Sequence, residues 1–165
     1  MSIKVPNYKR LGAIAVEELK KLNLIPPDDR LRKGPVAIAE CPEEIPCNIC
    51  VDVCPHKAIS MKTINDIPRI DWGKCTGCGV CVAICPGLAI FVVDLSKPGK
   101  AYITLPYEFL PVPKTGDKVL LLNRYGEHVG EGRVVKVIEY NKTWAITVEV
   151  PKELAMEVRA IRLKR

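Results

Sequence analysis

All eight cysteines of this 165-residue chain lie in two similar runs, and this duplication is the strongest constraint on its fold. The runs read Cys41-x5-Cys47-x2-Cys50-x3-Cys54-Pro55 and Cys75-x2-Cys78-x2-Cys81-x3-Cys85-Pro86. The last three cysteines of the first run recur 31 residues later, whereas Cys41 lies 34 residues before Cys75. The first loop therefore carries three extra residues. The repeat predicts two half-modules that each hold a metal centre.

The spacing also predicts which cysteines share a centre. Three cysteines in series followed by Cys-Pro are typical of two-cluster [4Fe–4S] proteins, in which the fourth cysteine binds the other cluster. We expect two [4Fe–4S] clusters. The expected ligands are Cys41, Cys47, Cys50 and Cys85 for the first cluster, and Cys75, Cys78, Cys81 and Cys54 for the second.

Other metal arrangements fit the pattern less well. A zinc ribbon uses pairs of Cys-x2-Cys rather than three cysteines in series with Cys-Pro after them. The displaced Cys41 leaves one alternative open, in which it is not a ligand and the first cluster is three-iron or water-exposed. Since every thiol is committed to metal, a reducing cytoplasm is the expected location.

The two cysteine loops differ in their backbone donors. Gly77 and Gly79 let the second loop approach its cluster closely, whereas Pro46 removes one N–H group from the first loop. Because fewer hydrogen bonds to sulfur lower a cluster's potential, we expect the first cluster to have the lower potential. His56 is expected to be a partly exposed bystander, since eight thiolates already complete two clusters.

Composition and patterning divide the chain into three segments. Residues 1–40 form an N-terminal extension with a short helix at 13–24, a charged linker at 28–34 and an extended stretch at 35–39. Residues 41–94 form the two-cluster region, which is too short to be stable by apolar burial alone. Residues 95–165 form a small β domain. The strands expected along the chain are 58–61, 67–71, 89–93, 101–105, 118–122, 133–140 and 143–150. The last residues predict a helix at 151–158 or, alternatively, a strand at 158–163.

Charge and motif content exclude several function classes. The formal net charge is +6, but the basic excess lies outside residues 41–94, which carry four basic and six acidic groups. This dilute scatter favours a solvated surface, so we expect no nucleic-acid partner. No apolar span of membrane length is visible, so we expect no membrane partner. The sequence offers no nucleophile–base pair, nucleotide loop or third metal motif, so we expect no catalytic residues and a non-enzymatic role.

Two resemblances sharpen this interpretation. Residues 41–93 resemble the bacterial-type two-[4Fe–4S] ferredoxins. Longer strings are similar to the ferredoxin-like small subunit of multi-subunit flavoprotein dehydrogenases of the proline, hydroxyproline or sarcosine type in anaerobic microbes. These strings are Gly34-Pro-Val-Ala, Glu40-Cys-Pro-Glu-Glu-Ile-Pro-Cys-Asn48, Cys85-Pro-Gly-Leu-Ala-Ile-Phe-Val-Val-Asp94, Leu105-Pro-Tyr-Glu-Phe-Leu-Pro111 and Val150-Pro-Lys-Glu-Leu-Ala-Met-Glu-Val-Arg159.

The resemblances imply a fold, a partner and a role for Cys41. The expected fold is α+β, with a pseudo-twofold two-[4Fe–4S] ferredoxin core. The residue pattern of the flanks adds an N-terminal helical extension and, from short strands between turn signals, a small C-terminal β-barrel-like domain. The implied partners are flavoprotein subunits that carry FAD and in some cases [2Fe–2S], in a hetero-oligomer that relays single electrons. The subfamily pattern also favours Cys41 as a ligand. A free, diffusible ferredoxin serving several oxidoreductases is the alternative.

Overall fold

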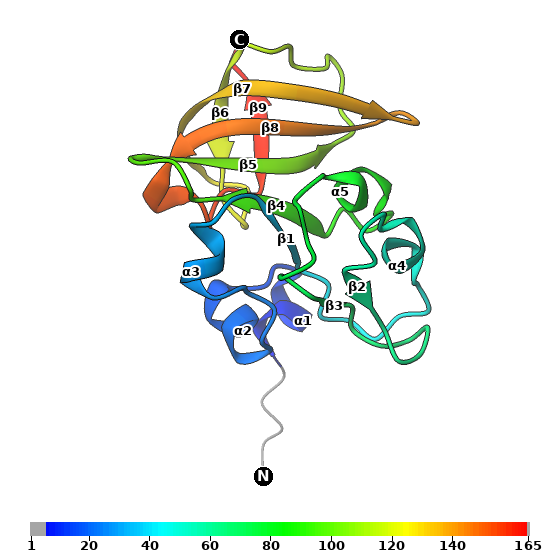
Figure 1. Ribbon diagram of the computed structural model, residues 1–165. Coiled ribbons are helices and arrows are strands. Elements are labelled where there is room, and N and C mark those ends of the chain that lie inside the picture. Colours follow the sequence, from blue (N-terminus) through cyan, green and yellow to red (C-terminus); the bar gives the residue numbers. More distant parts are fainter. Residues whose placement is uncertain (1–5, 165) are drawn as a thin grey trace.

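The computed structural model describes residues 6–164 and shows a mixed α and β protein whose sheets are antiparallel (Figure 1). The helices are α1 (Asn7–Leu11), α2 (Val16–Lys21), α3 (Asp28–Leu31), α4 (Ile49–Val53) and α5 (Val80–Ile84), with a 3-10 turn at Lys152–Leu154. The strands are β1 (Val36–Ala39), β2 (Ile59–Ser60), β3 (Arg69–Ile70), β4 (Ile90–Asp94), β5 (Lys100–Tyr107), β6 (Lys118–Leu122), β7 (His128–Tyr140), β8 (Thr143–Pro151) and β9 (Ala160–Leu163). Helices α1 and α2 lie at one end of the molecule, whereas α3 lies beside the large sheet and contributes Leu31 to its core.

One seven-stranded sheet joins all three predicted segments. Its order is β1-β4-β5-β8-β7-β6-β9, and β2 and β3 form a separate pair. The sheet crosses the boundary predicted at residues 94/95, because β4 pairs with β5 through Val92 and Thr104. Among residues 6–164, the paired strands form an open series with edges at β1 and β9. The barrel-like closure expected for residues 95–165 is not among these pairs, and β4 pairs with residues 102–104 of β5.

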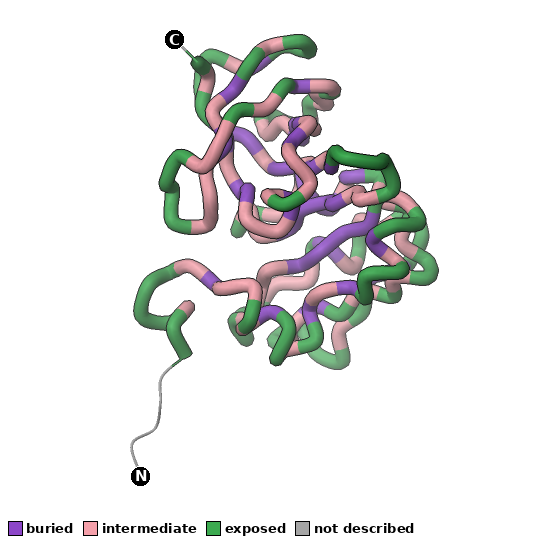
Figure 2. Tube along the Cα trace, turned by 90° about the vertical axis from the view of Figure 1, so that its left-hand side faces the viewer, coloured by how far each residue is buried: buried purple, intermediate pink, exposed green. Residues whose placement is uncertain are grey.

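Strands β1 and β4 separate two apolar cores. Both are buried along almost their whole length, as expected for strands covered on both faces. Val36 and Ile38 face the core of the large sheet, whereas Ala37 and Ala39 face the helices that carry cysteines. In Figure 2 the buried segments lie in the strands, and most exposed segments lie in loops and in the N-terminal helices. The cysteine region is therefore built directly onto the sheet.

The pattern of alternation located the strands well. Along β5, Ala101, Ile103, Leu105 and Tyr107 are buried while the residues between them are not, which is the period of two expected for a half-buried strand. Strand β6 coincides with the predicted range, β7 begins five residues before the predicted start at 133, and the other predicted strands agree to within two residues. The predictions of extended structure in 35–39 and of several strands after residue 100 are confirmed.

The predictions near the two ends were less accurate. The helix expected at 13–24 is confirmed only over Val16–Lys21. The linker prediction for 28–34 is wrong, because Asp28–Leu31 form α3 after Pro27, with acidic residues in the first turn as a helix N-terminus favours. At the C-terminus the strand alternative holds, since Lys152–Leu154 form only a short turn and β9 follows.

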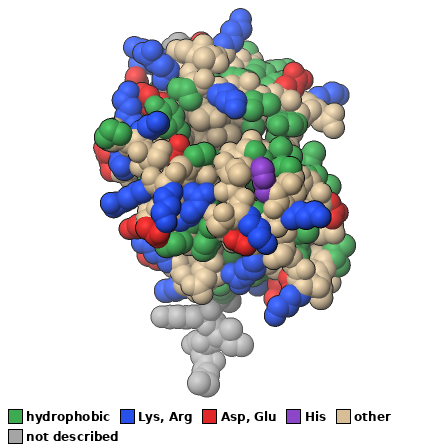
Figure 3. Space-filling model, viewed as in Figure 1, with side chains coloured by type: hydrophobic (Ala, Val, Ile, Leu, Met, Phe, Trp, Pro, Cys, Tyr) green, Lys and Arg blue, Asp and Glu red, His purple; other side chains and the backbone are tan. Residues whose placement is uncertain are grey.

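No helix within residues 6–164 has the length and apolar character needed to cross a membrane. Lys and Arg side chains are spread over the face in Figure 3 with Asp and Glu among them. On that face the charges are mixed, as predicted for a solvated surface.

Candidate metal centres

The two cysteine runs fold into the same local structure. Helix α4 ends at Cys54 and helix α5 ends at Cys85, and both of these residues are extended, with φ and ψ of −70° and 109° and of −66° and 115°. A proline follows each of them, and the residue before proline avoids helical geometry. A short helix therefore precedes each Cys-Pro pair. The two Cys-Pro cysteines are thus turned away from the helices that precede them.

Four cysteines line one hollow in the protein. They are Cys54 from the first run and Cys75, Cys78 and Cys81 from the second, and Gly77 and Gly79 complete part of the wall. Burial and then, in decreasing order, the charges of Cys75, Cys78, Cys54 and Cys50 together raise the pKa of Cys81 to about 12. The structure therefore brings together the four cysteines expected at the second centre.

The remaining four cysteines also act on one another. Burial and then the charges of Cys85, Cys41 and Cys47 together raise the pKa of Cys50 to about 11. The pKa of Cys41 is raised by burial and then by Cys85 and Cys47. Cys41 therefore lies near the other three despite its displaced position in the sequence. The two groups adjoin, since Cys50 also acts on Cys81.

This chemistry suits a metal cluster. All eight cysteines are free of disulfides. Thiolates are soft ligands, and a bound metal deprotonates a coordinating thiol outright, which offsets the mutual repulsion that otherwise raises these pKa values. No three His, Cys, Asp or Glu side chains of residues 6–164 meet at a point that suits a single ion. The residues present fit two four-thiolate centres of iron–sulfur type.

Backbone N–H groups point at three of the sulfurs. Ala37 N donates to Cys75 Sγ at 3.3 Å, Ala58 N to Cys54 Sγ at 3.3 Å, and Ala89 N to Cys85 Sγ at 3.5 Å. The first two sulfurs belong to the group around the hollow. Hydrogen bonds of this kind orient a thiolate and stabilise its charge.

The second loop requires glycine at one position for steric reasons. Gly77 has a φ of +68°, and a Cβ there would lie 2.6 Å from Pro35 Cβ and 2.7 Å from the Pro35 carbonyl carbon and oxygen. Gly79 has a φ of +85°, but a Cβ there would meet only Thr104 Cγ2, at 3.9 Å. Close approach therefore matters at Gly77, and backbone conformation at both glycines.

Sequence reasoning missed Arg30, which fastens the second loop to the N-terminal extension. Its guanidinium donates to four backbone carbonyls: Nε to Trp72 at 2.6 Å, Nη1 to Gly34 at 3.1 Å, and Nη2 to Pro35 at 3.2 Å and Cys75 at 2.7 Å. Arg30 lies in the run that the sequence indicated as a charged linker. No local signal distinguishes it from its basic neighbours.

The other residues considered from the sequence have bystander positions. His56 is exposed and lines the outer wall of the hollow beside Cys54. Trp72 and Trp144 pack against the core of the large sheet. Cys78 is the exposed member of the eight cysteines, so the hollow comes closest to the surface there.

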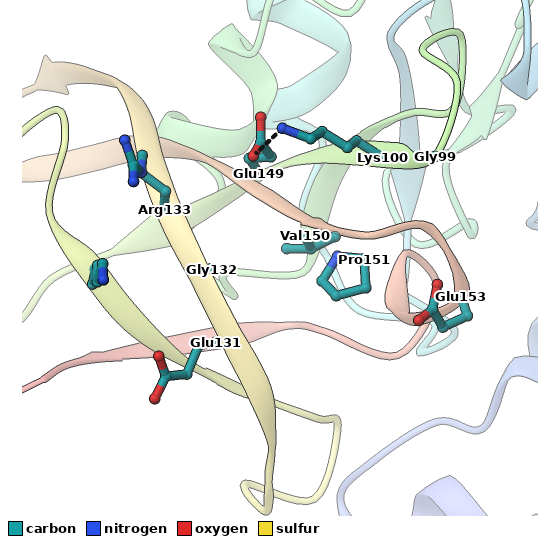
Figure 4. A pocket seen from close by; sticks show the side chains of 10 residues that line it. Gly99, Lys100, Glu131, Gly132, Arg133, Glu149, Val150, Pro151 and Glu153 are labelled. Atoms are coloured by element: carbon teal, nitrogen blue, oxygen red, sulfur yellow. Dashed lines mark hydrogen bonds and ion pairs between the residues drawn. The ribbon is translucent and has the colours of Figure 1, made fainter.

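A separate hollow lies on the large sheet, away from every cysteine (Figure 4). Lys100 and Glu149 form an ion pair of 2.8 Å within it, and Glu131 and Arg133 stand on the neighbouring strand β7. Basic and acidic side chains balance along its wall, with Lys100, Lys118 and Arg133 facing Glu131, Glu149 and Glu153.

Comparison with known proteins supports the metal-centre interpretation. The profile of the 4Fe-4S dicluster domain family matches residues 45–95, just under a third of the chain. This part of the chain is a ferredoxin-type iron–sulfur domain, a class typical of electron carriers. No curated protein and no solved structure matches the chain. Cys41 precedes the matched residues, so its role depends on its position beside Cys47, Cys50 and Cys85.

Proposed function

We propose that the chain relays single electrons through two adjoining [4Fe–4S] clusters. The first cluster is held by Cys41, Cys47, Cys50 and Cys85, and the second by Cys54, Cys75, Cys78 and Cys81. The observation that carries this proposal is the exchange of Cys-Pro cysteines, because each group of four holds three cysteines of one run and the last cysteine of the other. This exchange is the ligation that two-cluster ferredoxins use.

The clusters supply the redox chemistry, and the protein supplies position, potential and access. Ala37, Ala58 and Ala89 direct N–H groups at thiolate sulfurs, while the apolar core around Val82 and Ile90 shields the centres from water. Helices α4 and α5 pack together, which keeps the two groups close. Cys78 offers the nearest edge for transfer to a partner, because it is exposed.

Iron and sulfide analysis of the full chain tests the clusters. After anaerobic reconstitution we expect about eight irons and eight sulfides per chain. The exchange of ligands is tested separately with Cys85→Ser. This variant should damage the cluster held mainly by the first run while the other remains. Damage confined to the cluster of Cys75, Cys78 and Cys81 would contradict the assignment.

We further propose that the chain is a fixed subunit of a flavoprotein dehydrogenase of the amino-acid or amine type. The resemblance described above suggests it, and an exposed apolar surface supports it. Phe109 and Leu110 are 72% and 82% exposed, and they border an apolar groove against β6 and β9. Large apolar side chains this exposed are characteristic of contact surfaces. In this role the chain would take electrons from a reduced flavin one at a time and pass them to a further acceptor.

Purification of the native complex under anaerobic conditions tests the subunit role. We expect a flavin-containing chain to copurify, and added proline or sarcosine to bleach the visible absorbance of the clusters. Leu110→Ser should release the chain from its partner with both clusters intact. Leu11→Ser, which alters an apolar side chain 58% exposed on α1, serves as the matched control. A chain that purifies alone, with clusters, would favour the free ferredoxin.

A further inference from the structure

Three charged side chains form a buried group beside the first cysteine run. Arg124 donates to Glu40 in a bidentate pair, with Nη1 2.6 Å from Oε2 and Nη2 2.7 Å from Oε1. Arg159 Nε donates to the same Glu40 Oε1 at 2.8 Å. The side chains are only 4–6% exposed. We call Glu40, Arg124 and Arg159 the buried triad.

The buried triad draws on three distant parts of the chain. Glu40 follows β1, Arg124 lies in the turn between β6 and β7, and Arg159 precedes β9. Backbone carbonyls complete much of the shell: Arg124 also donates to Ile14 and Met156, and Arg159 to Ala155 and Val158. The shell holds both guanidinium groups in one orientation.

The charges of the buried triad do not balance. Two guanidinium groups share one carboxylate, which leaves one positive charge in excess. Burial is the largest influence on the pKa of Arg159 and lowers it, Glu40 raises it, and Arg124 lowers it. Glu157 adds a weaker attraction, and it is partly exposed to solvent. Buried charges in proteins are normally paired, so the excess charge calls for a further negative group nearby.

Unsatisfied donors in the buried triad agree with this imbalance. Arg124 Nε and Arg159 Nη2 are buried and have no hydrogen-bond acceptor among residues 6–164. Part of the remaining face of Arg159 is covered by the Phe91 ring, whose centroid lies 4.9 Å from the guanidinium carbon. This cation–π contact compensates only a fraction of the lost hydration.

The first cysteine group lies next to the buried triad. Glu40 is bonded directly to Cys41, and Glu40 N donates to Ala89 O at 2.7 Å. Ala89 N in turn donates to Cys85 Sγ at 3.5 Å. The shallow pocket that Arg124 and Arg159 line is also bordered by Gly87–Ala89, just after Cys85. Glu40 therefore links the buried triad to two of the four proposed ligands of the first cluster.

We propose that the buried triad sets the reduction potential of the first cluster, and that its excess positive charge raises this potential. A [4Fe–4S] cluster with four thiolates is anionic and becomes more negative on reduction. A nearby positive charge therefore stabilises the reduced form. The effect opposes that of the poorer backbone donors expected for the first loop. The inference rests on the proposed assignment of Cys41 and Cys85 to this cluster.

The expected magnitude follows from Coulomb's law. At an effective dielectric constant of about 20, one unit charge acting over a distance on the order of 10 Å changes an equilibrium constant for reduction by roughly tenfold. For one electron this corresponds to about 59 mV. Glu40 is bonded to Cys41 and to the segment that follows Cys85, both proposed ligands of the first cluster, so the shift of the second cluster should be smaller.

Redox titration of the full chain, followed by electron paramagnetic resonance, tests the proposal. Cys41→Ser identifies the reduction step of the first cluster. Arg159→Met keeps the bidentate Glu40–Arg124 pair and removes the excess charge. The equilibrium constant for reduction of the first cluster should therefore fall about tenfold. Arg159→Lys keeps the charge and should restore most of the potential. Arg162→Met removes a charge outside the buried triad, three residues along the chain, and should change neither step.

A reversal of sign provides the second arm of the test. Glu40→Gln leaves two positive charges and should make the first cluster easier to reduce. The proposal would be overturned by equal shifts in the reduction potentials of both clusters. It would also be overturned if Arg159→Lys lowered the potential of the first cluster as much as Arg159→Met does. Loss of the first cluster from both Arg159→Met and Glu40→Gln would also overturn it, because the buried triad would then only hold the fold. A wild-type chain without iron would instead refute the proposed function.

Discussion

The contrast between Gly77→Ala and Gly79→Ala isolates the close approach of the second cysteine loop to Pro35. Both glycines have positive φ, so alanine costs about 1–2 kcal/mol of conformational energy at either position. Only at Gly77 would the new Cβ overlap another residue, at 2.6–2.7 Å from Pro35 atoms, including the backbone. Overpacking of this kind adds about 1–3 kcal/mol. We therefore expect Gly77→Ala to cost about 2–5 kcal/mol and Gly79→Ala about 1–2 kcal/mol.

Thermal loss of the cluster absorbance measures this difference. For a chain of this size 1 kcal/mol corresponds to about 2–4 °C in the midpoint, so the two variants should differ by about 2–12 °C at one heating rate. Gly126→Ala is the control, because Gly126 has a φ of +80° with no atom near its Cβ position. It should lower the midpoint by about as much as Gly79→Ala does. Equal midpoints for Gly77→Ala and Gly79→Ala would show that Pro35 yields without cost and would refute the steric reasoning.

Three further predictions concern Arg30, the metal and the thiols. Arg30→Met removes four hydrogen bonds to backbone carbonyls, so a chelator should remove iron from the second cluster faster than in the wild-type chain. Arg30→Lys should restore the slow rate only poorly, because an ammonium group lacks the planar fork of a guanidinium. Equal rates of iron loss in the wild type and both variants would contradict this role of Arg30. Complete removal of iron should unfold residues 41–94 and make them sensitive to protease, since the apolar core there is small; a resistant apo-protein would refute a folding role of the clusters. The pH dependence of the apo-protein tests the same point, because in the folded state burial and neighbouring thiolates raise the pKa of Cys50 and Cys81 above the ordinary value of 9.0, to about 11 and about 12. A raised folded-state pKa gives stability that is full below the unfolded pKa and is lost as the pH rises through the folded pKa. With residues 41–94 unfolded, these two thiols should add no fall in stability to urea between pH of about 9 and 12; a fall traced to them would contradict the unfolding.

The sequence predicted elements wherever the signal was local. Strand β6 coincides with residues 118–122, and β5 shows the expected alternation, because inward and outward side chains repeat every two residues. The helix ends at Cys54 and Cys85 were predictable from the prolines that follow them. By contrast, α3 was missed, since four residues after two prolines have too little pattern to be distinguished from a charged loop.

The arrangement of these elements was much less predictable. A change of sequence character after Asp94 suggested a boundary, yet Val92 and Val93 pair directly with Thr104 and Ile103. A strand can be apolar because it faces one core or because it lies between two. The composition of β4 does not distinguish these cases, so only the register of the sheet showed that the cysteine region and the C-terminal strands share one framework.

What the sequence determined by itself was the chemistry of the metal centres. Eight thiolates at fixed spacing specify soft ligands and turns of fixed length, because both are properties of short segments. Tertiary structure alone decided the environment of those thiolates. Arg30 reaches Cys75 across 45 residues, and Arg159 reaches Glu40 across 119. A charge acts through space rather than along the chain, so no spacing in the sequence indicates which of 25 basic residues stands beside a cluster.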